Sequence, residues 1–188
     1  IMTMSHQMRG LVESLLELAR VDNGGQNMVF SRLNFSELVS DALLPFEPVY
    51  FEQGLTLESN VEENLFVKGS QQHLKQVADI LLDNASKYAS ADSTVRVILR
   101  RQGSHCLLSV ASAGDAISKE DLKNIFKRFY RMDKARSMNH SYGLGLSIAQ
   151  GIAARHGGWI QVSSKQGLGS RFTLVLPWVE QSAEEIEE

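Results

Sequence analysis

Two pairs of strand-like segments, each joined by a short turn, most constrain the fold of this chain. Residues 94–99 and 105–111 flank the turn Gln102-Gly103-Ser104, and residues 159–165 and 170–176 flank a second glycine-containing turn. Apolar segments separated by such turns indicate β-hairpins, whose strands run antiparallel. Together with shorter strands expected at 55–58 and 65–67, they predict a mainly antiparallel sheet.

Helical patterns lie between these strands and supply a second layer. Residues 70–88 place apolar side chains every three to four positions, at Leu74, Val77, Ala78, Leu81, Leu82 and Ala85. Further helices are expected at 34–53, 118–128 and 145–156. A capping box of Asn34 with Glu37 opens the first of these, and Pro45 and Pro48 make its middle irregular. Three helices covering one face of the sheet form a two-layer α/β sandwich of the α+β class.

The N-terminal residues form a separate amphipathic pattern. An apolar stripe at Met8, Leu11, Val12, Leu15, Leu16 and Ala19 predicts a helix over residues 1–22. We expect a linker at 23–33, a globular domain at 34–178 and an acidic disordered tail at 179–188. The stripe favours a helix-bundle or dimer contact. Packing of the stripe on its own domain is the alternative.

Composition excludes several classes of function. A net charge of −3 argues against nucleic-acid binding, because such proteins usually carry a basic face. The single Cys106 excludes an internal disulfide, and the five histidines lack the spacing of a zinc site. No apolar run approaches the roughly 20 residues that span a bilayer. Because the chain begins within a predicted helix, we expect it to be part of a longer protein.

Two separated segments carry candidate chemistry. Asn84 and Lys87 lie three residues apart on the helix 70–88, and Tyr88 follows. An amide oxygen is a hard ligand suited to Mg²⁺, a lysine can meet phosphate oxygens, and a tyrosine ring can stack on a base. Gly143 and Gly145 precede a helix, whose first N–H groups can face an anion. The segments predict a magnesium-nucleotide site; surface residues and packing glycines are the alternatives.

The order of these motifs resembles the ATP-binding catalytic domain of two-component sensor histidine kinases, within the group that includes gyrase, Hsp90 and MutL. Residues 81–88 resemble the N box of that family, residues 125–131 its F box, and residues 142–146 its second glycine box. Residues 155–158 and 167–172 resemble its closing signatures. The resemblance covers residues 34 to 177 and implies the family's Bergerat-type ATP-binding fold.

The resemblance implies roles for individual residues. Asn84 is the expected Mg²⁺ ligand, Lys87 a phosphate contact and Tyr88 a neighbour of the base. The loop 130–142 is the expected lid. The other ATP-binding positions that it implies are Ser112 and Gly114 of the first glycine box, Gly143, Leu144, Gly145 and Leu146 of the second, and Arg131 and Arg136 of the lid. For either arginine, a solvated loop surface remains an equal alternative.

Three positions depart from the family pattern. Ile80 stands where the N box usually has an earlier asparagine, and Ser141 replaces the first glycine of the second glycine box. Ser112 stands where the first glycine box has an aspartate that accepts a hydrogen bond from the adenine amino group. Asp115 lies three residues further on, so that role is not transferred to it. These departures reduce the expected nucleotide affinity and, to a lesser degree, the selectivity for adenine.

The resemblance implies an enzyme that transfers the γ-phosphoryl of ATP to a histidine outside this chain, for relay to a response regulator. Residues 5–9, which include His6, resemble the phospho-acceptor box only in part and lack its Thr-Pro, so the chain alone is not expected to phosphorylate itself. Homodimerisation through the N-terminal helix is expected, in the cytoplasmic portion of a membrane-anchored bacterial sensor. The alternatives are a degenerate nucleotide-binding module acting through protein contacts, or another ATPase or serine kinase of the same group.

Overall fold

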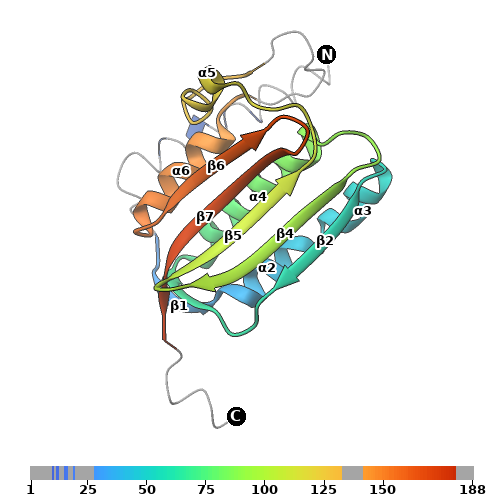
Figure 1. Cartoon of the computed structure of the whole chain (residues 1–188). Helices are drawn as coiled ribbons and strands as arrows, with labels where there is room; N and C mark the ends of the chain where they lie inside the picture. The colour runs from blue at the N-terminus through green and yellow to red at the C-terminus, as the bar shows by residue number, and fades with distance from the viewer. Residues whose placement is uncertain are drawn as a thin grey trace.

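The strands form one mixed sheet whose pairs are mostly antiparallel. A computed structural model of the chain describes Gly10, Val12, Leu15, Leu16, Ala19 and residues 28–132 and 142–180. Its strands are β1 (Ser31–Asn34), β2 (Thr56–Val61), β3 (Phe66–Gly69), β4 (Thr94–Gln102), β5 (His105–Ser112), β6 (Trp159–Lys165) and β7 (Gly169–Val179). The order is β1-β3-β7-β5-β4-β2, with β6 also paired to β7 (Figure 1). Only the β2–β4 pair, among these, is parallel.

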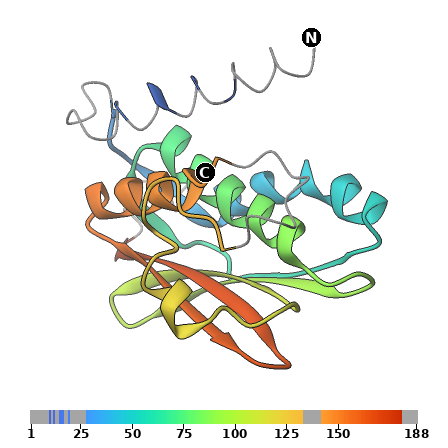
Figure 2. The same ribbon diagram turned by 90° about the horizontal axis from the view of Figure 1, so that it is seen from above.

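Four of the described helices pack on one face of this sheet and complete the predicted two-layer architecture (Figure 2). They are α2 (Phe35–Leu43), α3 (Phe46–Glu52), α4 (Gln71–Tyr88) and α6 (Gly145–Arg155). The short α5 (Lys119–Leu122) lies apart from them, at one end of the sheet (Figure 1). Helix α4 lies between α2 and α6 and contacts β5 beneath it. Its predicted apolar face is buried in full. Because that face is used for the core, the remaining side of α4 is available for other contacts.

The core lies between α4, α6 and the inward side chains of the central strands. Val95, Val97 and Leu99 alternate with exposed residues along β4, and β5 buries Leu108 and Val110 in the same way. This period of two is what a sheet with one covered face requires. The predicted hairpin of β4 and β5 is confirmed, with Val97 paired to Val110.

Several element boundaries differ from the sequence-based expectation. The helix expected at 34–53 is two helices, because Pro45 lacks the N–H that would continue α2, and a new helix starts behind it. The Asn34 cap itself is confirmed: its side chain accepts from the backbone N–H groups of Ser36 and Glu37. Helix α5 ends at Leu122 and not near Arg128; turns follow it.

The sheet also extends further at both ends than expected. Strand β7, expected to end at residue 176, continues to Val179, and the N–H of Trp178 donates to the carbonyl of Ser104. Strand β1 begins at Ser31, inside the expected linker, and pairs with β3. Pairing between distant segments decides these limits, so the residues themselves do not reveal them.

The N-terminal pattern is helical at each position that the structure describes. Gly10, Val12, Leu15, Leu16 and Ala19 are helical, and the side chains of the middle three are exposed. An exposed apolar stripe is compatible with the expected dimer contact, which stays a prediction. In the described parts of the chain, no helix is both long and apolar enough to cross a membrane.

Candidate functional site

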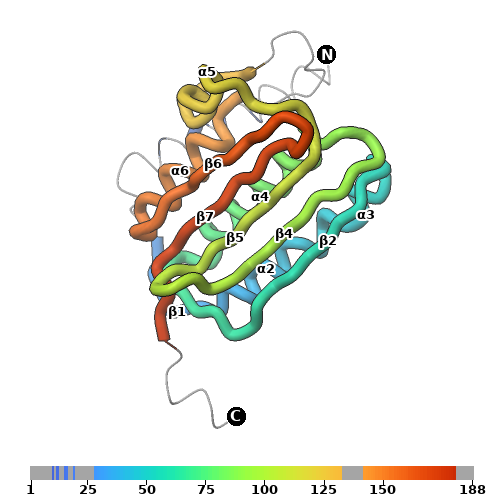
Figure 3. The backbone as a smooth tube through the Cα atoms, in the orientation of Figure 1, coloured from blue at the N-terminus to red at the C-terminus, as the bar shows by residue number. Residues whose placement is uncertain are grey.

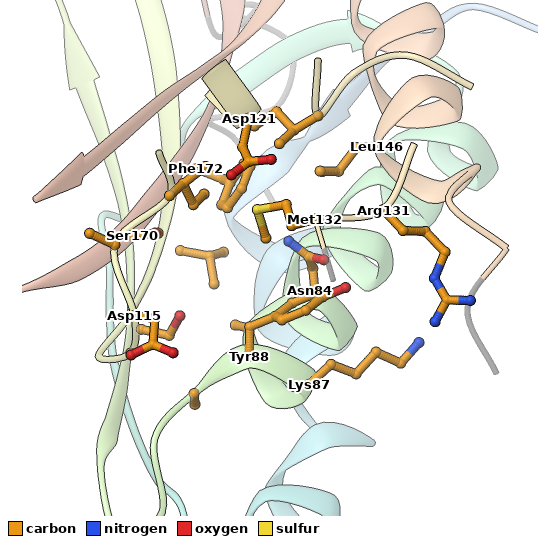
Figure 4. A pocket seen from close by; sticks show the side chains of 18 of the residues that line it. Asn84, Lys87, Tyr88, Asp115, Asp121, Arg131, Met132, Leu146, Ser170 and Phe172 are labelled. Atoms are coloured by element: carbon orange, nitrogen blue, oxygen red, sulfur yellow. The ribbon is translucent and has the colours of Figure 1, made fainter. Parts of the chain in front are cut away.

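A cavity of about 520 Å³ opens between the C-terminal half of α4 and the end of β5 (Figure 4). Cavities of this size are typical of small-molecule sites. The residues that line it come from α4, β5, the segments that follow both, the start of α6 and β7. They are Asn84, Ala85, Lys87, Tyr88, Ala89, Ser90, Val110, Ser112, Gly114, Asp115, Ala116, Ile117, Asp121, Ile125, Tyr130, Arg131, Met132, Leu146, Ser170 and Phe172.

Helix α4 presents three of the predicted site residues to the cavity. Asn84, Lys87 and Tyr88 line it from the side of the helix that is not used for the core. Tyr50, buried in the core, donates from Oη to the carbonyl oxygen of Leu82 at 2.7 Å and ties α4 to α3. Lys87 Nζ lies 2.5 Å from a carboxylate oxygen of Asp83, one helical turn earlier. This i, i+4 pair holds the lysine cation at the rim of the cavity.

The loop after β5 is fixed on two sides. The N–H of Ser90 donates to the carbonyl of Ala113 at 2.8 Å, which joins the loop to the end of α4. A Cβ at Gly114 would lie 2.5 Å from the carbonyl oxygen of Tyr88, so this close approach requires glycine. On the other side, the loop passes the β6–β7 turn (Figure 3), where a Cβ at Gly169 would overlap the carbonyl oxygen of Ser112.

The next part of this loop carries a hydrogen-bonded acidic group. Ser118 caps α5, accepting from the N–H of Asp121 and donating to its carboxylate. The hydroxyl of Tyr130 donates to the other carboxylate oxygen at 2.5 Å. The Ser118 and Tyr130 hydrogen bonds lower the pKa of Asp121, and the same carboxylate raises the pKa of Tyr130. Asp121 is therefore ionised at neutral pH and holds Tyr130 beside the cavity.

The structure brings most of the predicted site residues together and places others elsewhere. Those that line the cavity are Asn84, Lys87, Tyr88, Ser112, Gly114, Arg131 and Leu146. Gly143, Leu144 and Gly145 are not among its lining residues. Leu144 is buried in the core, and Gly145 begins α6 against the side chain of Ile80. Arg136 and most of the expected lid lie outside the described residues.

Gly143 adopts a backbone conformation and a close packing that favour glycine. Its φ is +70°, and a Cβ there would lie 2.6 Å from the carbonyl oxygen of Tyr130. Its carbonyl accepts a 2.9 Å hydrogen bond from the N–H of Phe129. The backbone on both sides of residues 131–142 is thereby held together. The expected role of Gly143 in ATP binding stays a prediction.

Thirteen of the twenty lining residues were not proposed from the sequence, and they include Asp115, Asp121, Tyr130, Met132, Ser170 and Phe172. The register of the sheet explains Ser170, which is the direct partner of Ser112 on β7. Phe172 lies two residues further along the same strand, opposite Val110. Tyr130, Met132, Ser170 and Phe172 lie in segments that resemble family motifs or the expected lid. Asp121 lies at the start of the helix expected at 118–128, a pattern that indicates a helix start and not a site.

The donor set suits a magnesium ion carried by a phosphorylated ligand better than a metal bound by protein alone. Within the described residues, no three or more His, Cys, Asp or Glu side chains are grouped as a metal cage. Mg²⁺ usually takes one or two protein oxygens and completes its shell with water and substrate phosphates. Asn84 supplies one such oxygen at the cavity, and Lys87 and Arg131 supply positive charge near it.

Comparison with known proteins agrees with this architecture. Residues 69–180 match the family model described as histidine kinase-, DNA gyrase B-, and HSP90-like ATPase. This region contains α4, the cavity and every strand from β4 to β7. The match therefore covers more than half of the chain and includes its candidate site.

The relatives described next are named as a sensor protein and as a sensor-like histidine kinase. The chain is 32% identical over 161 residues to sensor protein DltS of Streptococcus agalactiae serotype V, covering 86% of this chain and 41% of that protein. It is 33% identical over 174 residues to sensor-like histidine kinase SenX3 of Mycobacterium tuberculosis H37Rv, covering 92% and 42%. The chain thus spans about two fifths of the length of these relatives.

A solved structure gives the same result. The Acinetobacter baumannii histidine kinase AdeS superposes with a TM-score of 0.77 at 25% identity, covering 95% of this chain and 82% of that one. The agreement extends over nearly all of this chain. By fold, motif order and sequence match, this chain belongs to the histidine kinase-, DNA gyrase B- and HSP90-like ATPase family.

Proposed function

We propose that this chain is the ATP-binding catalytic domain of a two-component sensor histidine kinase. In this proposal the cavity binds ATP with Mg²⁺, and the γ-phosphoryl passes to a histidine outside the chain and then to an aspartate of a response regulator. The supporting observation is that Asn84, Lys87 and Arg131 meet aromatic and apolar side chains in one cavity. Such a cavity suits a ligand with a flat base and an anionic chain.

Each residue group has a task in this proposal. Tyr88 and Phe172 offer ring surface to the base, and Lys87 and Arg131 offer positive charge to the phosphates. Lys87 shares its charge with Asp83, so phosphate oxygens must join or replace that carboxylate. The amide oxygen of Asn84 is the metal ligand. When bound, Mg²⁺ would supply charge that offsets the phosphate charge during transfer.

The proposal extends to the organisation of the parent protein. Residues 1–22 form the second helix of a dimerisation hairpin, residues 34–178 the catalytic domain, and the acceptor histidine lies on the other helix of the hairpin. The exposed side chains of Val12, Leu15 and Leu16 support a contact with a partner helix. Dimerisation, phosphorelay to a receiver domain, and a place in the cytoplasmic part of a membrane-anchored sensor belong to this proposal.

Titration calorimetry with ATP, in Mg²⁺ and in EDTA, tests the site. We expect measurable binding in Mg²⁺ and weaker binding in EDTA. Asn84→Ala should remove the difference, because the proposed protein ligand to the metal is lost. Asn60→Ala is the matched control, since Asn60 is exposed on β2 and does not line the cavity. Unchanged Mg²⁺-dependent affinity in Asn84→Ala would show that the metal site is misplaced.

A labelling experiment tests the location of the acceptor. Incubation of the chain with γ-labelled ATP should leave no acid-labile phosphate on it, because the acceptor is proposed to lie outside it. The His6→Ala variant is the control, since His6 is the histidine with a partial match to an acceptor motif. Label on the unmodified chain that disappears in this variant would place the acceptor at His6.

A second candidate function is a non-catalytic module that acts through protein contacts. The observation in its favour is Ser112, a neutral hydroxyl that lines the cavity where the resembled family has an aspartate. The calorimetric experiment separates the two functions. Folded protein without detectable affinity for ATP in Mg²⁺ would favour the non-catalytic module.

A further inference from the structure

The face of the sheet opposite the helices carries an excess of positive charge. No described helix packs on this face, which is turned toward the viewer in Figure 1. Because Val97 and Leu99 of β4 point to the core, the residues between and beside them point outward, and the same alternation holds on either side of Leu174 in β7. The outward charged residues of β2, β4, β6 and β7 are four cations and one carboxylate, namely Arg96, Arg100, Lys165, Arg171 and Glu58. The whole chain, by contrast, has a net charge of −3.

Apolar side chains lie among these cations. The strand register aligns Arg100, Leu107, Val175 and Trp159 in one row across four neighbouring strands. Trp159 is 46% exposed, and Ile98, two residues before Arg100 on β4, is 36% exposed. Tryptophan and arginine are enriched where proteins contact one another. We call this group the basic sheet surface: Arg96, Ile98, Arg100, Trp159, Lys165 and Arg171.

The helical layer carries a surface of opposite charge. Residues 35–55, which include α2 and α3, contain four acidic residues and no Lys, Arg or His. The backbone stays in the right-handed helical region at Leu44 and Pro45, between the two helices. Leu44, Pro48 and Phe51 are therefore spaced along one side of a helical path, and all three are exposed. We call this group the acidic helix surface: Glu37, Asp41, Leu44, Glu47, Pro48, Phe51 and Glu52.

Phe51 is the most exposed large apolar side chain of the acidic helix surface, at 84%. Exposed apolar side chains bordered by charges are typical of a surface that binds another protein. An aromatic ring also attracts a guanidinium group, and the basic sheet surface presents arginines beside exposed apolar side chains. The two surfaces are therefore complementary both in charge and in the kind of apolar contact they offer.

We propose that the acidic helix surface of one copy of this chain binds the basic sheet surface of a second copy. The two surfaces lie on opposite sides of the sheet, so they cannot meet within one copy (Figure 2). The contact joins unlike surfaces and leaves one of each unoccupied, so further copies can add head to tail. It involves neither the N-terminal helix nor the nucleotide cavity.

Two variants, each blocking one surface, test this contact. Phe51→Lys places a cation on the acidic helix surface, and Arg100→Glu places an anion on the basic sheet surface; both side chains are exposed. In sedimentation velocity at low salt, the mean sedimentation coefficient of the unmodified chain should rise with concentration. Each variant alone should associate at least about tenfold more weakly. An equimolar mixture of the two should regain association, because each variant retains the surface that the other has lost.

Two substitutions outside both surfaces are the matched controls. Val29→Lys changes an exposed aliphatic residue to lysine, and Lys123→Glu reverses an exposed charge. Both controls should associate as the unmodified chain does. Raising the salt from about 0.05 M to about 0.5 M should weaken the association, because it screens the attraction between the surfaces. Circular dichroism checks that every variant is folded.

Any of three results would overturn the proposal. They are an unmodified chain whose sedimentation coefficient does not rise with concentration at low salt, variants that associate as strongly as the unmodified chain, and a mixture that associates no more than either variant alone. Association through the N-terminal helix would give the second result. Neither Phe51 nor Arg100 lines the cavity, so ATP affinity should be unchanged in both variants. Failure of this contact therefore leaves the proposed function untouched.

Discussion

The β6–β7 turn offers a matched pair of glycines that isolates the contact supporting the candidate site. Gly167 and Gly169 have almost the same positive φ, +79° and +83°. Their surroundings differ: a Cβ at Gly167 would meet nothing within 4 Å. A Cβ at Gly169 would overlap the Ser112 carbonyl oxygen and lie 2.7 Å from Ala113 Cα and 2.9 Å from the Gly114 nitrogen. Alanine therefore introduces the same backbone strain at both positions, but a steric clash is added at position 169.

The magnitudes follow from these two effects. A non-glycine residue with left-handed backbone lowers the free energy of unfolding by about 1–2 kcal/mol, and this loss is common to both variants. At Gly169 the atoms in the way belong to backbone that is paired on both sides, so relief requires the strand or the loop to move. Overpacking of this kind costs about 1–3 kcal/mol more. For a domain of this size each kcal/mol lowers Tm by about 2–4 °C. We expect Gly169→Ala to melt about 2–12 °C below Gly167→Ala.

Thermal unfolding followed by circular dichroism measures this difference, and calorimetry with ATP in Mg²⁺ adds a functional reading. Gly169→Ala displaces Ser112 and Gly114, which line the cavity, so its nucleotide affinity should fall. Gly167→Ala should bind as the unmodified chain does. Equal melting temperatures for the two variants would refute the argument that the close approach of β7 to the loop fixes the site.

Two further predictions concern the core. Tyr50→Phe removes the hydrogen bond to the carbonyl of Leu82 and should lower the free energy of unfolding, measured in urea, by about 1 kcal/mol; no change would mean that the bond contributes nothing net. Buried His156 accepts a hydrogen bond from the N–H of Ser70 through Nε2, and its Nδ1 lies 2.7 Å from the carbonyl oxygen of Ile152. One acceptor and one donor nitrogen are the pattern of a neutral imidazole ring. Burial lowers its pKa, so the unfolded chain binds more protons and stability is lost as pH falls below about 6.5. His156→Leu should lower the free energy of unfolding by about 2–3 kcal/mol at pH 7.5, because the N–H of Ser70 loses its partner, and by less at pH 5.5. An equal difference between variant and unmodified chain at both pH values would contradict this.

Local patterns in the sequence were sufficient to identify the main elements and part of the site. The periodicity of residues 70–88 separates a core face from a side that carries Asn84, Lys87 and Tyr88, and all three line the cavity. The turn at residues 102–104 predicts the β4–β5 hairpin, and Asn34 predicts the start of α2. These features depend on contacts between residues close in the chain, so the sequence alone determines them.

Tertiary contacts decided the rest, because the residues concerned are neighbours only after folding. Ser170 reaches the cavity through its register with Ser112, 58 positions away along the chain. Gly143 packs against the backbone of Tyr130, and the residues around Gly143 in the sequence do not indicate this contact. Asp115 was not proposed as a site residue, yet it lines the cavity, between backbone groups of Ala113 and Ile117 that are hydrogen-bonded to other segments. Sequence patterns report which face of an element is buried, whereas the partners of the other face depend on how the elements pack.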